Sequence, residues 1–226
     1  MTKIVLALTI GFVTISFLLA QEMSPSPSLS PSATPTRSVR ISFVPPPLEG
    51  KISLGVYDQS GRLVRVLHQE AEFDQFTIGA DALATKWDGK DDDEHDLPAG
   101  KYSARGFLVA PMKIEKISEA NEGVFIDSAP PVRIKLMSNP LENNERPTID
   151  LTAGYDDDSA YIQTTDGLPL VTVTKTSNSL DVAVVLDLDR NKSPRMLIRD
   201  SGTVREFRIT GLSKMMAFDC GNFELK

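Results

Sequence analysis

The sequence predicts an all-β fold, in which a β-sandwich is followed by a second small β region. Apolar and polar residues alternate in short runs, as in KISLGVYD at residues 51–58 and KYSARGFLV at residues 101–109. This period of two residues is typical of strands with one buried face. Clusters of Gly, Pro, Asn and Asp separate the runs at roughly 8–12-residue intervals, as in sandwiches and barrels. The one helix expected is an N-terminal signal helix.

The first half of the chain gives a clear order of elements. Residues 39–44 form a first strand, which ends at three consecutive prolines. In the strand at residues 51–58, Ile52, Leu54 and Val56 lie on one face. The elements that follow are a tight loop at residues 59–61, a strand at 62–67 with Leu63 and Val66 as apolar anchors, an irregular connection at 74–83 and a short strand at 84–87.

Turn chemistry dominates the stretch from Trp87 to Tyr102. Asp88-Gly89 is a strong turn dipeptide, because both residue types tolerate a positive φ. The acidic run at residues 91–96 holds the connection in water, since unpaired carboxylates are costly to bury. After a second turn at residues 98–100, the next strand places Tyr102, Ala104, Gly106 and Leu108 on one face.

These motifs, in this order, resemble a known family. An apolar-Val-Tyr-Asp segment, a glycine turn, Arg-Leu-Val-Arg-x-Leu, Trp-Asp-Gly-Lys-Asp and Leu-Pro-Ala-Gly-Lys-Tyr look like the FlgD-like immunoglobulin-type domain, which is named after the flagellar hook-capping scaffold protein. The resemblance covers roughly residues 39–110. It implies an immunoglobulin-like sandwich used as a spacer, scaffold or docking unit in secreted bacterial proteins. The acidic run departs from the family, in which a shorter turn is usual. The matching residues are Val56, Tyr57, Asp58, Gly61, Arg62, Leu63, Val64, Leu67, Trp87, Asp88, Gly89, Pro98, Ala99, Gly100 and Tyr102.

Composition excludes several classes of function. The formal net charge of the 226 residues is −7, and it becomes −8 without the first twenty, whose only charged residue is Lys3. An acidic chain is a poor partner for nucleic acid or for an anionic membrane surface. The single cysteine, Cys220, forbids an internal disulfide and a multi-cysteine metal site.

The N-terminus predicts export. Residues 1–20 have one Lys before an uncharged apolar run, which is the layout of a signal peptide that is cut after Ala20. The alternative is an uncleaved anchor, and membrane contact is expected only in that case. Residues 21–38 are rich in Ser and Pro and predict an extended linker, with O-linked sugars as an alternative. We therefore expect a secreted, periplasmic or cell-envelope protein.

The domain ranges that follow are residues 39–128 for the first sandwich and 129–226 for a second β region, either propeller-blade-like or a sandwich. For residues 114–121 the pattern favours a strand or a loop over a helical turn. A closed propeller needs at least four blades, so a truncated piece of a longer protein and a complete small β domain both remain open. Strands are expected at residues 132–136, 159–164, 168–176, 181–188, 195–199, 203–210 and 214–218, with a turn at Gly221-Asn222.

Three features suggest a metal or ligand, and each has a simpler interpretation. Residues 187–193 begin like a calcium loop, but Lys192 and Ile198 stand where Gly and Glu are needed, which favours a polar hairpin turn. The acidic runs at 91–96 and 156–158 also favour solvated turns over calcium. Trp87 and Tyr102 could bind a sugar, but aromatic residues in this setting are more often sandwich core.

No catalytic constellation emerges from the sequence. His68 and His95, the two histidines, lack further zinc ligands at usable spacing, and both are expected at the surface. Cys220 is expected to be a buried, inert thiol among apolar neighbours. A nucleophile elbow, a phosphate loop and a dinucleotide fingerprint are missing. We therefore predict no catalytic, cofactor-binding or metal residues and no cofactor.

The sequence favours an exported, non-enzymatic structural or docking protein whose partner is a protein or cell-envelope component. One alternative is an N-terminal accessory fragment of a larger secreted β-propeller protein or enzyme. The other is a carbohydrate-binding module.

Overall fold

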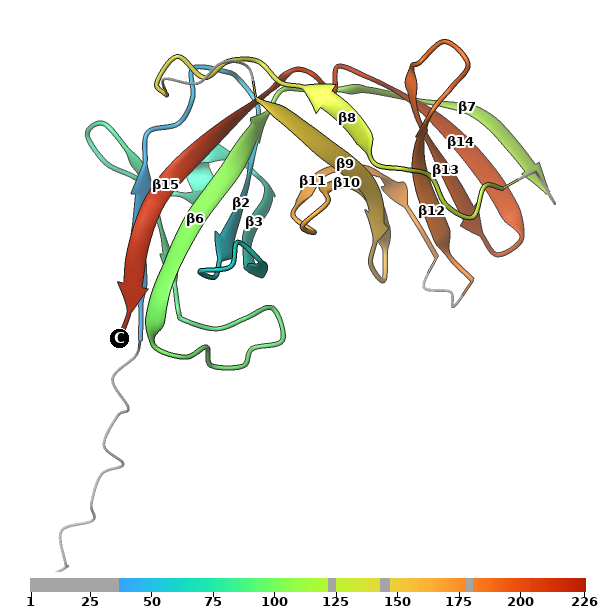
Figure 1. The fold of residues 1–226 in the computed structure, drawn as a ribbon. Coiled ribbons are helices and arrows are strands. Elements are labelled where there is room, and N and C mark those ends of the chain that lie inside the picture. The colour runs from blue at the N-terminus through green and yellow to red at the C-terminus, as the bar shows by residue number, and fades with distance from the viewer. Residues whose placement is uncertain (1–36, 122–124, 143–146, 178–180) are drawn as a thin grey trace, which may run out of the picture. The chain divides into compact units, whose positions relative to one another are not determined.

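A computed structural model describes residues 37–121, 125–142, 147–177 and 181–226. Within these ranges the chain is all-β, as predicted: four antiparallel sheets and one short 3₁₀ helix, Phe73–Gln75 (Figure 1). Among the described residues no helix is long and apolar enough to cross a membrane. The predicted signal peptide at residues 1–20, and the predicted linker up to residue 36, lie outside the described residues.

Two sheets form a first sandwich. One has the strand order β1-β5-β4 and the other has the order β15-β6-β2-β3. Every predicted strand of the first half is present, and each begins or ends within a few residues of its predicted bounds. The strands are β1 (Val39–Phe43), β2 (Lys51–Tyr57), β3 (Leu63–Ala71), β4 (Thr77–Ile78), β5 (Leu83–Trp87), β6 (Gly100–Val109) and β15 (Met215–Leu225).

The core of the first sandwich lies between these two sheets. The predicted inward face of β2, Ile52, Leu54 and Val56, is fully buried. Tyr102, Ala104 and Leu108 of β6 are buried in the same core, as their alternation predicted. From the other sheet come Ile41, Phe43, Leu83 and Trp87.

Two further sheets form a second sandwich. Their orders are β11-β10-β9-β8 and β12-β13-β14-β7. Of the two arrangements expected for residues 129–226, this is the sandwich, because side chains from both sheets share one core. The strand at residues 148–155 was missing from the sequence prediction. The strands are β7 (Lys113–Asn121), β8 (Val132–Lys135), β9 (Thr148–Tyr155), β10 (Ser159–Thr164), β11 (Pro169–Lys175), β12 (Ala183–Leu188), β13 (Pro194–Asp200) and β14 (Thr203–Thr210).

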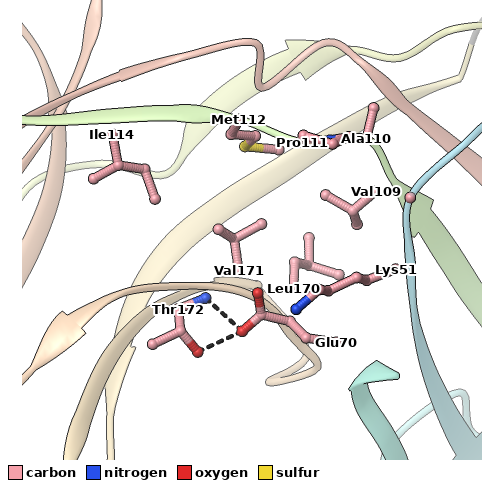
Figure 2. A pocket seen from close by; sticks show the side chains of 11 residues that line it. Lys51, Glu70, Val109, Ala110, Pro111, Met112, Ile114, Leu170, Val171 and Thr172 are labelled. Atoms are coloured by element: carbon pink, nitrogen blue, oxygen red, sulfur yellow. Dashed lines mark hydrogen bonds between the residues drawn. The ribbon is translucent and has the colours of Figure 1, made fainter. Parts of the chain in front are cut away.

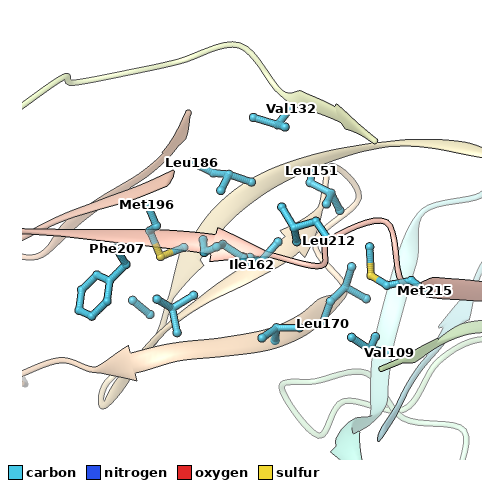
Figure 3. Close-up of a cluster of buried hydrophobic side chains, with 14 of the residues drawn as sticks. Val109, Val132, Leu151, Ile162, Leu170, Leu186, Met196, Phe207, Leu212 and Met215 are labelled. Atoms are coloured by element: carbon cyan, nitrogen blue, oxygen red, sulfur yellow. The ribbon is translucent and has the colours of Figure 1, made fainter. Parts of the chain in front are cut away.

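The core of the second sandwich extends to the first. Leu151, Ile162 and Leu170 from one sheet meet Leu186, Met196 and Phe207 from the other (Figure 3). Ile198 and Ile209 of the second sheet belong to the same core. Phe107 and Val109 of β6 and Met215 of β15 belong to the same cluster. The two sandwiches are therefore joined by continuous apolar packing.

Strand pairing also crosses the predicted boundary between residues 128 and 129. β7 precedes that boundary and pairs with β14 of the second sandwich. β15 lies at the end of the chain and returns to pair with β6 of the first sandwich. The second sandwich is thus inserted between the sixth and seventh strands of the first.

Two details differ from the sequence prediction. Leu63 and Val66 are apolar anchors of β3, but they pack against the core of the second sandwich, because they lie on the outer face of the sheet. The expected turn at Gly221-Asn222 is a bulge inside one long strand. The register with β6 shifts between Asp219 and Asn222, and Gly221 takes up the bulge with a φ of 83°.

A polar contact reinforces the junction between the sandwiches. Arg105 of β6 donates a 2.8 Å hydrogen bond to Asp166 in the β10–β11 turn. The same guanidinium lies 3.9 Å from the centroid of the Tyr57 ring. Burial, with the nearby Asp166 charge adding to it, raises the pKa of Tyr57 to about 12, so this phenol stays neutral.

Candidate functional site

A groove of about 640 Å³ lies at one end of the first sandwich. It opens where the β2–β3 turn meets the start of β6 and the end of β15. Three of its residues, Asp58, Gly61 and Tyr102, carry the family resemblance described above. The others come from three separate parts of the chain: Gln59, Lys101, Ser103, Asn222, Phe223 and Glu224.

The turn at one wall of the groove is fixed by Asp58. One carboxylate oxygen accepts hydrogen bonds from the hydroxyl and backbone N–H of Ser60 and from the backbone N–H of Arg62. The other oxygen accepts one from the Arg62 side chain at 3.2 Å. These bonds, with that of the Ser60 hydroxyl foremost, lower the pKa of Asp58 to about 2. Gly61 completes the turn with a φ of 81°. The wall is therefore rigid, and Asp58 acts as a structural acceptor.

Aromatic packing supports the opposite side of the groove. Trp87 is 1% exposed, and its ring lies 5.0 Å from Tyr102 and 5.8 Å from Phe223, edge to face in both cases. The indole N–H donates to the carbonyl of Lys90, and the Tyr102 hydroxyl donates to the carbonyl of Pro98. The prediction that Trp87 and Tyr102 are core residues is confirmed, and they do not form an exposed stacking surface for a sugar.

The acidic run after Trp87 packs against the edge of β3. The Arg65 side chain donates to the carbonyl of Asp91 and forms an ion pair with Glu94 at 2.9 Å. Asp92 accepts a 2.9 Å hydrogen bond from the backbone N–H of Val66. Because β3 is an outer strand of its sheet, this loop covers N–H groups that could otherwise recruit another strand.

Three side chains of the acidic run converge. Ligand atoms of Asp91, Asp93 and His95 lie within 4.8 Å of one another. The turn brings these alternate residues to one side. Asp91 already accepts the backbone N–H groups of Asp93 and His95, and these bonds lower its pKa, with that of His95 contributing most. The acidic run therefore forms a turn in which Asp91 accepts the turn's own backbone N–H groups, and a turn was predicted here.

The other two acidic segments are hairpin turns between paired strands. Asp189 accepts the backbone N–H groups of Asn191 and Ser193 between β12 and β13, while Asp187 pairs with Arg195 at 3.0 Å. Asp156 plays the same part between β9 and β10, where it accepts the N–H groups of Asp158 and Ser159. The prediction of polar turns holds for both segments.

His68, which was expected at the surface, is half-buried. Its ring centroid lies 4.3 Å from that of Phe76, with the two rings tilted by 38°, and its Nε2 lies 2.8 Å from the Thr85 hydroxyl. His68 therefore bridges the two sheets of the first sandwich. Burial lowers its pKa and favours the neutral ring.

The Cys220 thiol is partly buried against the core of the first sandwich. Burial, helped by the Asp219 and Glu142 charges, raises its pKa to about 12. The thiolate, which is the reactive form, is therefore strongly disfavoured. This agrees with the prediction of an inert thiol.

A second, smaller pocket of about 210 Å³ lies at the junction of the sandwiches (Figure 2). Its walls are mostly apolar, with Val109, Met112, Leu170 and Val171 among them. Glu70 reaches across it and accepts hydrogen bonds from the backbone N–H and the hydroxyl of Thr172 on β11. Glu70 has a φ of 47°, at an irregular point in the β2–β3 pairing. This pocket is part of the joint between the sandwiches.

Comparison with known proteins adds no neighbour. No family model matches the chain, and neither a curated protein nor a solved structure matches it.

Proposed function

We propose that the protein is an exported, non-enzymatic structural or docking protein, built on an FlgD-like immunoglobulin-type module, that binds a protein partner of the cell envelope. The observation that carries the proposal is the groove at the end of the first sandwich. Its rigid turn carries motif residues of the resemblance, and exposed Gln59, Lys101, Asn222 and Glu224 supply hydrogen-bonding and charged groups of both signs. Polar rims around aromatic packing are typical of interfaces that form and separate.

The inserted second sandwich supports a structural role. It is bound to the first by shared apolar packing, by the Arg105–Asp166 pair and by the Glu70–Thr172 hydrogen bonds. A body joined in this way holds a groove in a fixed position, which lowers the entropic cost of binding a partner.

Photo-crosslinking in the native organism tests the docking groove. A photoreactive residue replaces Lys101 in the groove or, as the control, Arg208 on β14, which is exposed in the second sandwich. We expect a discrete adduct with one envelope protein from position 101 and none from position 208. The same adduct from both positions would contradict the groove as the docking site.

Two further measurements test the remaining parts of the proposal. Fractionation and N-terminal sequencing should find the protein outside the cytoplasm with Gln21 as its first residue. The purified protein should show no turnover in a broad hydrolase and esterase screen, and turnover that a point mutation abolishes would overturn the non-enzymatic assignment. A specific hit on a glycan array would assign the groove to carbohydrate binding instead.

A further inference from the structure

Two cations lie directly opposite each other on the outer face of the β1-β5-β4 sheet. Arg40 of β1 is the cross-strand partner of Lys86 of β5. Their neighbours Ile41 and Trp87 point into the core, so Arg40 and Lys86 point away from it, and both are exposed. Side chains directly opposite in an antiparallel pair have Cβ atoms about 4.5–5.5 Å apart, and like charges there are destabilising.

A second pair of cations lies directly opposite across two strands, but carboxylates neutralise it. Arg195 and Arg208 are also direct cross-strand partners. There, Arg195 forms ion pairs with Asp187 at 3.0 Å and with Glu206 at 3.1 Å. Among the described residues no carboxylate forms such a pair with Arg40 or Lys86. Although the net charge of the chain is −7, these two cations lack a compensating carboxylate within the part of the chain that the structure describes.

The pair lines a concave surface, the cationic groove, of about 490 Å³. Its lining residues are Arg40, Gln75, Thr77, Ala84, Thr85 and Lys86. Buried Ala84 leaves room between the longer side chains, and no acidic residue is among the lining residues. The Thr85 hydroxyl is engaged with His68, which leaves the guanidinium, the ammonium, the Gln75 amide and the Thr77 hydroxyl as donors.

We infer that the cationic groove binds a phosphate group. A guanidinium presents a planar fork of donors that matches two oxygens of an oxyanion, and an ammonium adds a compact charge beside it. The neutral donors of Gln75 and Thr77 serve the remaining oxygens. A tetrahedral phosphate uses all of these donors, whereas a carboxylate has only two oxygens to offer.

Titration with inorganic phosphate tests the inference. Binding is followed by calorimetry and by backbone amide shifts, against sodium chloride of equal ionic strength, for the wild-type protein and for Arg40→Gln and Lys86→Gln. Loss of one charge-assisted hydrogen bond should weaken phosphate affinity about tenfold. The matched control is Arg208→Gln, which removes an exposed cross-strand arginine outside the groove and should leave the affinity unchanged. Equal phosphate affinity in all four proteins would overturn the inference.

Two additional arms sharpen the result. Acetate in place of phosphate should bind more weakly, and equal affinity would refute the assignment to phosphate. In a sodium chloride solution of low ionic strength without phosphate, the urea midpoints of Arg40→Gln and Lys86→Gln should be no lower than that of the wild type. Each substitution removes the repulsion between two like charges. Destabilisation of both variants would show that the cations serve the fold instead of a ligand.

Discussion

Single carboxylate side chains in this protein accept hydrogen bonds from residues on the edge strands of the sheets. Glu70 accepts two hydrogen bonds from Thr172 on β11, Asp92 accepts one from Val66 on β3, and Glu142 accepts one from Asp219 on β15. All three strands lie at the edge of a sheet. A carboxylate at such a place satisfies a backbone donor and puts a negative charge where another strand would approach.

Glu70→Ala tests this role inside the junction. It leaves the Thr172 N–H and hydroxyl without their acceptor, and we expect the free energy of unfolding to fall by about 1–3 kcal/mol. The matched control is Glu72→Ala, which removes an exposed ion pair with Lys51 and should cost about 0–1 kcal/mol. Urea denaturation measures both. Equal losses would show that the Thr172 contact adds nothing.

His68 predicts how stability depends on pH. Its pKa is lowered in the folded protein by burial, so the unfolded chain binds a proton first as the pH falls below about 6.5. Stability is therefore fully present above that pH and declines toward the lowered folded pKa. The free energy of unfolding, measured by urea denaturation, should change less between pH 7.5 and 5.0 for His68→Gln than for the wild type. Asp91 and Asp200 have lowered carboxyl pKa values and act only below about pH 3.8, outside this window. If the free energy of unfolding depended on pH equally in the variant and the wild type, His68 would not be the source of this pH dependence.

At the scale of secondary-structure elements, irregular segments are held in place by the strands beside them. The acidic loop between β5 and β6 looks from its sequence like a solvated connection, yet Arg65 and Asp92 fix it against β3. β15 carries a bulge at Gly221 and still pairs with β6 on both sides of it. In both cases an irregular segment shapes the end of the first sandwich, next to the groove.

Asp92→Ala should loosen the attachment of the acidic loop to the edge of β3, which the loop covers. The Val66 N–H loses its acceptor, which we expect to cost about 0.5–1.5 kcal/mol and to increase aggregation through the uncovered edge of β3. Asp93→Ala removes a neighbouring charge while keeping the backbone N–H that bonds Asp91, and it should change stability little. Urea denaturation and light scattering compare the two. Aggregation of both variants to the same degree would point to lost net charge as the cause.

Local pattern predicted most of the strands, because alternation and turn residues act over a few positions. β9 was missed because Ile149 and Leu151 are followed on the same face by the small Ala153, and Gly154 comes next, which weakens the alternation. The bulge at Gly221 was interpreted as a turn, since glycine after a strand serves both. The groove could not be predicted as a site, because residues 58–61, 101–103 and 222–224 meet only through the pairing of β6 with both β2 and β15.

At the scale of the described residues, the two sandwiches behave as one body because they share a core. Phe107, Val109 and Met215 of the first sandwich pack with Leu170 and its neighbours in the second. Leu63 and Val66 of β3 add to that contact from the outer face of the sheet. Separation of the sandwiches would expose these side chains to water, at a cost of roughly 25 cal/mol per Å² of apolar surface.

Ile162→Ala tests this coupling. Ile162 is fully buried in the second sandwich, and its truncation should destabilise the protein by about 2–5 kcal/mol. Trp87, the single tryptophan, reports on the first sandwich alone. We expect its fluorescence and the far-ultraviolet circular dichroism to shift together to the same lower urea midpoint. A Trp87 transition that keeps the wild-type midpoint would show that the sandwiches unfold independently.

The return of β15 has a consequence for biosynthesis. The sheet that holds β6 receives its last strand from residues 215–225, and Arg37 donates a 2.8 Å hydrogen bond to the carbonyl of Lys226. A ribosome delivers those residues more than a hundred positions after β6. One flank of this sheet therefore stays open in the nascent chain until residues 215–225 have been synthesised.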